Sequence, residues 1–92
     1  MDYLLHWSIK AMPIKIKSKK IRDELATAVR KRRKKLGYSQ EELAYQANID
    51  RTYVSRLEGG KVAISVEIAY QIATALHTSL NNLIKEVEKN LS

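Results

Sequence analysis

The sequence has no cysteine and no apolar run of membrane length. Without cysteine there can be no disulfide, no thiolate metal site and no cysteine nucleophile. No apolar stretch approaches the roughly 20 residues that a membrane-spanning helix needs. The first residues also lack the basic start and long apolar segment of a signal peptide. We therefore expect a soluble, cytoplasmic protein with no membrane partner.

Residues that could carry catalysis or hold a metal are sparse and scattered. The two histidines, His6 and His77, are too few and too far apart to predict a metal site. Glu41 and Glu42 are adjacent, so a helix directs their carboxylates to different sides and they cannot act as an acid-base pair. No glycine-rich phosphate loop, nucleophile-base pair or zinc-ligand spacing occurs. The sequence predicts a protein that is not an enzyme and has no cofactor.

The positive charge is concentrated in the first part of the chain. The formal net charge is +7, and residues 1–38 contain 12 basic and 3 acidic side chains. Residues 39–92 contain 5 basic and 7 acidic ones. A basic end on a nearly neutral body predicts a polyanionic partner, although composition alone does not separate DNA from RNA or an anionic membrane.

Residues 1–18 differ from the rest and are predicted to form an extended N-terminal arm ahead of a domain at 19–92. Apolar residues crowd this segment, and residues 14–17 alternate Ile-Lys-Ile-Lys as a half-buried strand would. The alternative is an irregular arm whose apolar side chains rest on the domain. Met12 is an alternative start to Met1, and the sequence assigns the arm no role.

Capping residues and apolar periodicity predict five helices after the arm, and hence an all-α fold. The first helix runs from Ser18 to Gly37. Its predicted inward face carries Ile21, Leu25, Val29 and Leu36. The predicted caps of the next four helices are Ser39 (with Glu42), Asp50, Ser65 and either Thr78 or Ser79.

The second and third predicted helices are separated by only three residues and form a helix-turn-helix. Ala44, Val54 and Leu57 are the small and apolar residues that would lock these two helices together. The third helix, residues 51–58, then leaves Arg, Thr, Tyr and Ser side chains exposed on its other side. Such side chains hydrogen-bond base edges or phosphates, and an α-helix fits the major groove, which is about 12 Å wide. Double-stranded DNA is therefore the expected partner.

The segments LGYSQEELA (36–44) and IDRTYVSRLEGGK (49–61) resemble the Cro/phage-repressor (XRE-type) helix-turn-helix family. The resemblance extends from about Ile21 to Ile84. It implies a five-helix, lambda-repressor-like DNA-binding domain that works as a two-fold dimer. Residues 50–55 are also similar to the recognition helix of restriction-modification controller proteins. Where the family has glycine, this chain has Asn48 in the turn and His77 between the last two helices.

The resemblance also implies which side chains contact DNA. The base-reading positions of the family fall on Arg51, Thr52, Arg56 and, as a lesser candidate, Ser55. Its phosphate-contacting positions fall on Gln40, Tyr53 and Lys61. Gln40 begins a helix, where the N-terminus already favours an anion.

Six consecutive cations occupy residues 30–35. On a helix they point most of the way round, so they cannot all face one phosphate backbone. We expect Arg33 and its neighbours nearest Gly37 to lie beside DNA and add a salt-sensitive, non-specific contact. The alternative is a solvated helix end stabilised by the helix dipole. Glu58 is expected to pair with a nearby Arg or Lys rather than to touch DNA.

The last predicted helix has a longer apolar stripe than a terminal helix over a small core requires. We predict a dimer interface formed by Leu80, Leu83, Ile84 and Val87, because a monomer with one short recognition helix binds DNA weakly. Packing within one subunit is the first alternative to this interface. Strand pairing of residues 12–17 between subunits is the second.

The sequence thus predicts a sequence-specific transcriptional regulator that acts as a homodimer on a palindromic operator. The leading alternative is the antitoxin of a toxin-antitoxin pair, in which the same fold binds DNA while an apolar arm or tail grips a toxin protein. A third hypothesis is an RNA- or membrane-surface binder that uses the basic residues 30–35 alone and has no sequence preference.

Overall fold

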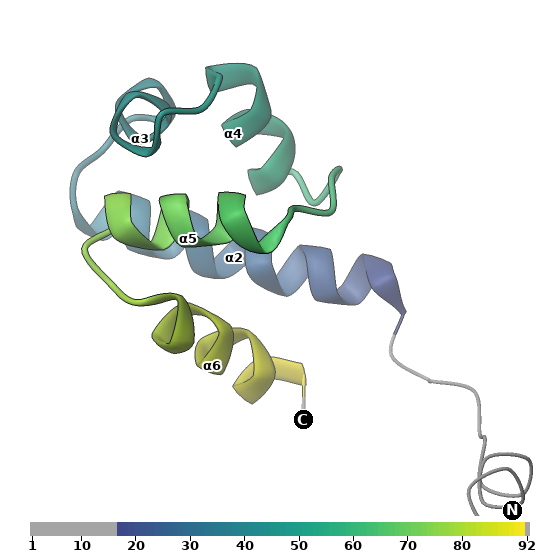
Figure 1. Ribbon diagram of the computed structural model, residues 1–92. Coiled ribbons are helices and arrows are strands. Elements are labelled where there is room, and N and C mark those ends of the chain that lie inside the picture. The colour runs from purple at the N-terminus through teal and green to yellow at the C-terminus, as the bar shows by residue number, and fades with distance from the viewer. Residues whose placement is uncertain (1–16, 92) are drawn as a thin grey trace, which may run out of the picture.

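The computed structural model describes residues 17–91, which contain five helices and no strand (Figure 1). The helices are α2 (Ser18–Lys35), α3 (Gln40–Ala47), α4 (Arg51–Glu58), α5 (Val66–Ala75) and α6 (Leu80–Leu91). The all-α prediction is confirmed for this part of the chain. The predicted arm falls almost entirely on residues 1–16, which lie outside the described residues.

Helices α2 and α5 form a central layer, with α3 and α4 on one side of it and α6 on the other (Figure 1). Helix α2 packs against α4 and α6, and α5 packs against α3 and α6. All five helices contribute to one core, whose largest fully buried side chains are Val29, Leu43, Val54, Leu57, Ile72 and Leu83. Because such a core is close-packed, α3 and α4 are held rigidly on the rest of the domain.

Four of the helices begin at a side chain that caps their first turn. The capping residues are Ser39, Asp50, Ser65 and Ser79, whose side-chain oxygens accept a backbone N–H two or three residues later. These predicted caps are confirmed. Helix α2 begins differently: Lys17 precedes it without a side-chain cap, and Ser18 is the first helical residue rather than the cap.

The first four helices all end on one residue with a left-handed backbone. These residues are Gly37, Asn48, Gly60 and His77, with φ between 58° and 77°. After each of them, the next residue donates its N–H to the carbonyl five positions back, for example Ile49 to Ala44 and Thr78 to Ala73, both at 3.0 Å. This hydrogen bond satisfies a carbonyl at the helix end that would otherwise lack a partner. The chain therefore keeps the glycine backbone geometry at Asn48 and His77 although neither residue is glycine.

Two residues that were predicted to lie on the inward face of the first helix are at the surface: Ile21 in α2 and Leu36, which directly follows it. The side chains of Ile21 and Leu36 are 43% and 39% exposed, whereas Leu25 and Val29 are buried. The arrangement of the other helices explains the difference. The N-terminal end of α2, which carries Ile21, extends past the helices that pack on it (Figure 1), and Leu36 stands after the last residue of the helix.

The predicted dimer interface needs a correction on α6. Leu83 and Val87 are 0% and 4% exposed and belong to the core, so the interface prediction is wrong for these two residues. The physical reason is that α6 needs both side chains to pack against α2 and α5 within the same chain. Ile84 remains 39% exposed, and Leu80 is half-buried at the edge of the core.

The left-handed residue in the turn between α3 and α4 gives a test of this geometry. We expect Asn48→Ala to lower the free energy of unfolding by about 1 kcal/mol, because a Cβ without a polar group is disfavoured at positive φ. Asn48→Gly should leave it unchanged or raise it, since glycine adopts this conformation freely. Urea unfolding of the three proteins measures both effects, with Gln46→Ala on exposed helix surface as the control. Equal stability of the Asn48→Ala and Asn48→Gly proteins would contradict the expectation.

Candidate nucleic-acid interface

Helix α4 has one exposed polar face and one buried face. Its buried residues are Val54, Leu57 and Glu58. Its exposed residues are Arg51, Thr52, Ser55 and Arg56. At about 100° per residue, these four exposed positions fall within an arc of roughly 140°. The structure therefore brings the four predicted base-reading residues together on one face, as a helix that enters a groove requires.

The three residues predicted to contact phosphate flank this face. Tyr53 is half-buried on α4, and Lys61 is exposed just beyond the end of α4. Gln40 is half-buried at the start of α3, and its Nε2 donates a hydrogen bond to Glu58 Oε1 at 3.1 Å. An amide nitrogen has two hydrogens, so Gln40 keeps one N–H for an outside acceptor while Glu58 fixes its orientation.

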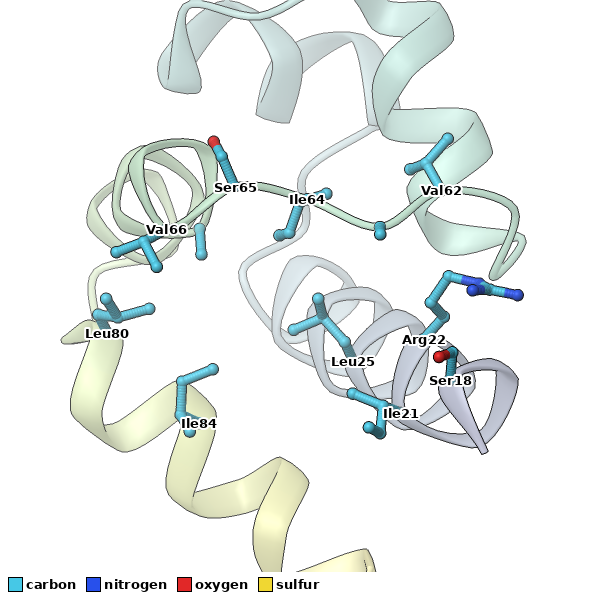
Figure 2. Close-up of a pocket in the computed structure, with 12 residues that line it drawn as sticks. Ser18, Ile21, Arg22, Leu25, Val62, Ile64, Ser65, Val66, Leu80 and Ile84 are labelled. Atoms are coloured by element: carbon cyan, nitrogen blue, oxygen red, sulfur yellow. The ribbon is translucent and has the colours of Figure 1, made fainter. Parts of the chain in front are cut away.

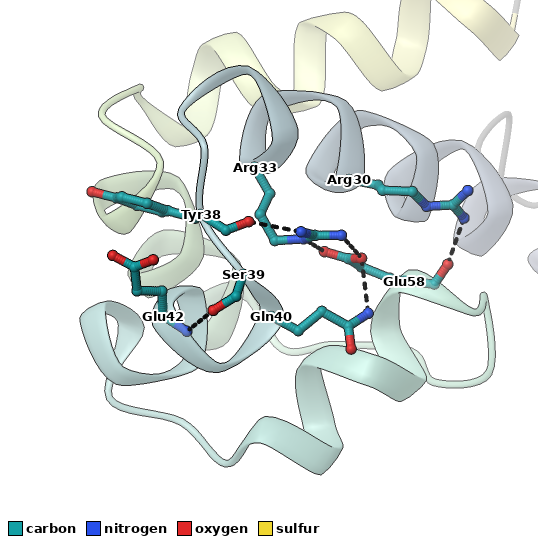
Figure 3. Close-up of polar contacts among 7 residues, drawn as sticks. All are labelled: Arg30, Arg33, Tyr38, Ser39, Gln40, Glu42 and Glu58. Carbon is teal, nitrogen blue, oxygen red and sulfur yellow. Dashed lines mark hydrogen bonds and ion pairs between the residues drawn. The ribbon is translucent and has the colours of Figure 1, made fainter.

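A buried ion pair attaches α4 to α2 (Figure 3). Arg33 Nε and Nη2 donate to the two carboxylate oxygens of Glu58 at 2.6 and 2.9 Å. The side chains of Arg33 and Glu58 are only 11% and 4% exposed. Because Gln40 donates to the same carboxylate, Glu58 links α2, α3 and α4 at a single point. Such a two-pronged pair is stronger and more directional than a single hydrogen bond.

All three guanidinium nitrogens of Arg33 are used inside the protein, since Nη1 donates to the backbone carbonyl of Tyr38 at 2.8 Å. The hydrogen bonds to Glu58 raise the pKa of Arg33; burial opposes this shift and the charge of Glu58 adds to it. Arg33 therefore stays cationic, and its guanidinium is bound within the domain. The phosphate contact predicted for Arg33 does not fit this position. The predicted pairing of Glu58 with a nearby Arg or Lys is confirmed.

Two further arginines of α2 hold the C-terminal end of α4, and the sequence analysis missed both roles. Arg30 Nη2 donates to the carbonyl of Glu58 at 2.9 Å, and Arg22 Nε donates to the carbonyl of Gly60 at 3.3 Å. Cations at this end of a helix bind its free carbonyls and oppose its dipole. The spacing of these arginines was a signal that could have revealed the two roles, because residues 22, 30 and 33 fall on one face of a helix.

The cationic run 30–35 divides between internal partners and solvent. Arg32 pairs with Glu86 of α6 at 3.0 Å, so each of the three arginines in the run has a partner within the domain. Lys31, Lys34 and Lys35 are exposed. The run is thus chiefly a structural element of α2, and its lysines are the exposed members for which no partner within the domain was described above.

Other kinds of site find no support in the described residues. Within residues 17–91, no three His, Cys, Asp or Glu side chains gather closely enough to hold a metal ion. No helix in that range is long and apolar enough to cross a membrane.

These features define a helix-turn-helix protein. Helices α3 and α4 are joined by three residues, and α2, α5 and α6 support the pair from behind. Residues 29–83 match the family model described as helix-turn-helix. The chain belongs to the Cro/phage-repressor (XRE-type) helix-turn-helix family.

Three known proteins are similar to this chain. The control protein C.MunI of Mycoplasma sp. is 38% identical over 58 residues, which is 63% of this chain and 78% of that protein. The crystal structure of the clp gene regulator ClgR from Corynebacterium glutamicum superposes with a TM-score of 0.72 at 28% identity, covering 76% of this chain and 74% of ClgR. The restriction-modification controller protein C.Esp1396I, crystallised as a tetramer with its 35 base-pair operator, has a TM-score of 0.65 at 31% identity, covering 73% of this chain and 93% of that one. The similarity to controller proteins predicted from residues 50–55 is thereby confirmed.

The Arg33–Glu58 pair makes a direct prediction about stability. Glu58→Gln leaves the buried guanidinium without a counter-charge, and we expect the free energy of unfolding to fall by about 3 kcal/mol. Glu86→Gln is the matched control, because it breaks the Arg32–Glu86 pair, whose side chains are 30% and 24% exposed. This more exposed pair should contribute less than about 1 kcal/mol. Equal losses for the two variants in urea unfolding would show that the buried pair has no special role.

Proposed function

We propose that the protein is a sequence-specific, DNA-binding transcriptional regulator of the controller-protein type. One observation carries the proposal: the polar face of α4 is exposed on a helix whose other face is fixed in the core. A rigid helix can enter the major groove without first paying an ordering cost. A regulatory role without enzymatic activity agrees with the regulators and controller proteins that this chain resembles.

Base recognition is assigned to the exposed arc of α4. Arg51 and Arg56 would read purines, since a guanidinium donates two hydrogen bonds to guanine O6 and N7. Thr52 and Ser55 lie between them and offer hydroxyl groups, and the Thr52 methyl suits the methyl group of thymine. These four residues would supply the sequence preference.

Phosphate contacts would fix the position of α4 along the groove. Gln40 holds its amide at the N-terminus of α3, where backbone N–H groups and the helix dipole attract an anion. Tyr53 and Lys61 stand on the flanks of α4 and would bind the backbone without reading sequence. The exposed lysines at the end of α2 are not required for this arrangement.

Two subunits would bind two half-sites of a palindrome about one DNA turn (~34 Å) apart. Ile84 and Leu80 are the accessible members of the predicted interface on α6, and we place the dimer contact there. The C.Esp1396I structure holds a tetramer on an operator, which supports an oligomer on DNA for this family. The relatives named above are controller proteins and regulators, so the antitoxin hypothesis gains no support.

Substitution of a base-reading arginine should change specificity as well as affinity. With an operator selected from a random DNA pool, Arg56→Ala should weaken binding by about 1–3 kcal/mol and relax the preference at one base pair. Lys61→Ala should weaken cognate and random DNA alike and lower the salt dependence by about one phosphate contact. Fluorescence anisotropy with both DNAs measures these effects. If Arg56→Ala loses the same affinity on cognate and random DNA, Arg56 is not a base reader.

The dimer contact predicts a separate result in solution. Ile84→Glu places a charge on the exposed part of α6 and should shift the protein to monomer in analytical ultracentrifugation. Its affinity for a full palindrome should fall toward its affinity for a single half-site, because the gain from binding as a dimer is lost. Tyr70→Glu is the matched control, since Tyr70 is a large, 62% exposed side chain on α5. A dimer that persists unchanged in the Ile84→Glu protein would place the interface elsewhere.

A further inference from the structure

A tyrosine and a histidine join the two chain segments that lead into α3 and α6. Tyr38 belongs to the connection between α2 and α3, and His77 belongs to the connection between α5 and α6. Tyr38 Oη and His77 Nε2 form a hydrogen bond of 3.0 Å, and the ring centroids are 6.3 Å apart. A neutral imidazole with its proton on Nδ1 accepts this bond from the phenol. The contact therefore ties together two turns that are 39 residues apart in the sequence.

His77 has a backbone conformation that glycine would adopt more easily. Its φ is 59°, in the left-handed region where a Cβ is disfavoured. Glycine at this position would keep the helix end and relieve the backbone, but it has no side chain that could reach Tyr38. Histidine therefore adds a contact that glycine cannot make, at a position where the backbone favours glycine.

Tyr38 is fixed through its main chain as well as its side chain. Its N–H donates to the carbonyl of Arg33 at 3.1 Å, and its own carbonyl accepts a hydrogen bond from Arg33 Nη1 at 2.8 Å (Figure 3). With the phenol bound to His77, every polar group of Tyr38 has a partner. The next residue, Ser39, caps α3, and Gln40 is the first residue of that helix. The place at which α3 begins is therefore set directly after the most tightly held residue of the connection.

We propose that Tyr38 and His77 are positioning residues for the N-terminus of α3, where the proposed function, on which this inference rests, puts a phosphate of DNA. Arg33 binds only the main chain of Tyr38, and the contact with His77 adds a second anchor through the side chain. A helix N-terminus binds an anion well only while its N–H groups are aimed at that anion. Loosening the pair should thus weaken phosphate binding and leave the base preference unchanged, since phosphate contacts carry no sequence information.

Three substitutions of His77 separate positioning from stability. His77→Gly removes the contact and eases the backbone. His77→Asn keeps a residue that tolerates the left-handed backbone, but its amide is too short to reach Tyr38. His77→Gln places an amide about where histidine places Nε2, and so restores a hydrogen bond to Tyr38.

We expect the dissociation constants for cognate and random DNA to rise together, about three- to tenfold, in the His77→Gly and His77→Asn proteins. In the His77→Gln protein both constants should stay close to those of the natural chain. Urea unfolding should nevertheless show the His77→Gln protein to be the least stable of the three, because glutamine gains least from a positive φ. Affinity that simply follows stability across the three variants would overturn the proposal, as would a changed preference at a single base pair.

Removing the other partner should have the same effect on DNA binding. Tyr38→Phe deletes only the phenol oxygen and should raise both dissociation constants as much as His77→Gly does. The Tyr38→Phe/His77→Gly protein should bind no more weakly than either single variant, because both changes remove one shared contact. The matched control is Tyr70→Phe on α5, where the tyrosine is 62% exposed, and it should bind as the natural chain does. Fully additive losses in the double variant overturn the proposal.

Sedimentation shows whether an affinity loss arises through the dimer instead. Leu80 and Ile84, where the dimer contact is proposed, line an apolar groove to which neither Tyr38 nor His77 belongs (Figure 2). All of the Tyr38 and His77 variants should therefore sediment as the natural chain does. A shift to lighter species that accompanies the affinity loss would overturn the positioning role.

Amide hydrogen exchange tests the pair without DNA. The N–H of Glu42 donates to Ser39 Oγ and that of Leu43 to the Ser39 carbonyl, both at 3.0 Å. These two amides should exchange at least about threefold faster in the His77→Gly and Tyr38→Phe proteins than in the natural chain, and at the natural rate in His77→Gln. Equal rates in all four proteins overturn the proposal. A natural chain that binds no DNA would overturn the proposed function, while the exchange rates would still decide whether the pair holds the start of α3.

Discussion

The buried contact of Arg33 with Glu58 is the constraint on which the proposed reading surface depends. Glu58 is the last residue of α4, and its carboxylate accepts hydrogen bonds from both α2 and α3. A charge placed inside a protein is tolerated only when its partner is held in good geometry. The pair therefore permits little sliding or rotation of α4, and the orientation of α4 decides which side chains face outward. The same carboxylate also positions Gln40, so one contact orients both the proposed base-reading face and the side chain proposed to contact phosphate.

The arginines and lysines of α2 have different uses, and this changes the meaning of the basic N-terminal half. Arg22, Arg30 and Arg33 all donate to the end of α4, where three sets of carbonyl or carboxylate oxygens converge. A guanidinium suits this task because its donors are fixed in a planar fork. The proposed DNA contacts instead use Arg51, Arg56 and Lys61, which come from the nearly neutral part of the chain. Net charge therefore predicted a polyanionic partner but not the residues that would meet it.

The local signals of the sequence were sufficient for the secondary structure. Serine and aspartate caps, the three-residue turn and the left-handed stops all act within a few residues of the chain, so their effect does not depend on distant contacts. The exposed face of α4 followed from the same periodicity, because Val54 and Leu57 fix which side is buried. At Asn48 and His77 the glycine of the family motif is absent, yet the backbone keeps the left-handed conformation that the glycine would adopt. Residue identity alone therefore does not reveal the backbone geometry at these two positions.

What only the tertiary structure decided was the partner of each side chain. The stripe on α6 has one periodicity whether it packs on its own core or on a second subunit, and the packed helices assign Leu83 and Val87 to the core while leaving Ile84 exposed. The cationic run carries the same charge whether it meets phosphate or a carboxylate, so its charge does not reveal its partner. Glu58, which is 25 residues away in the sequence, determines the role of Arg33. Sequence periodicity specifies the direction of a side chain from its helix, and only the arrangement of all the helices specifies what that side chain contacts.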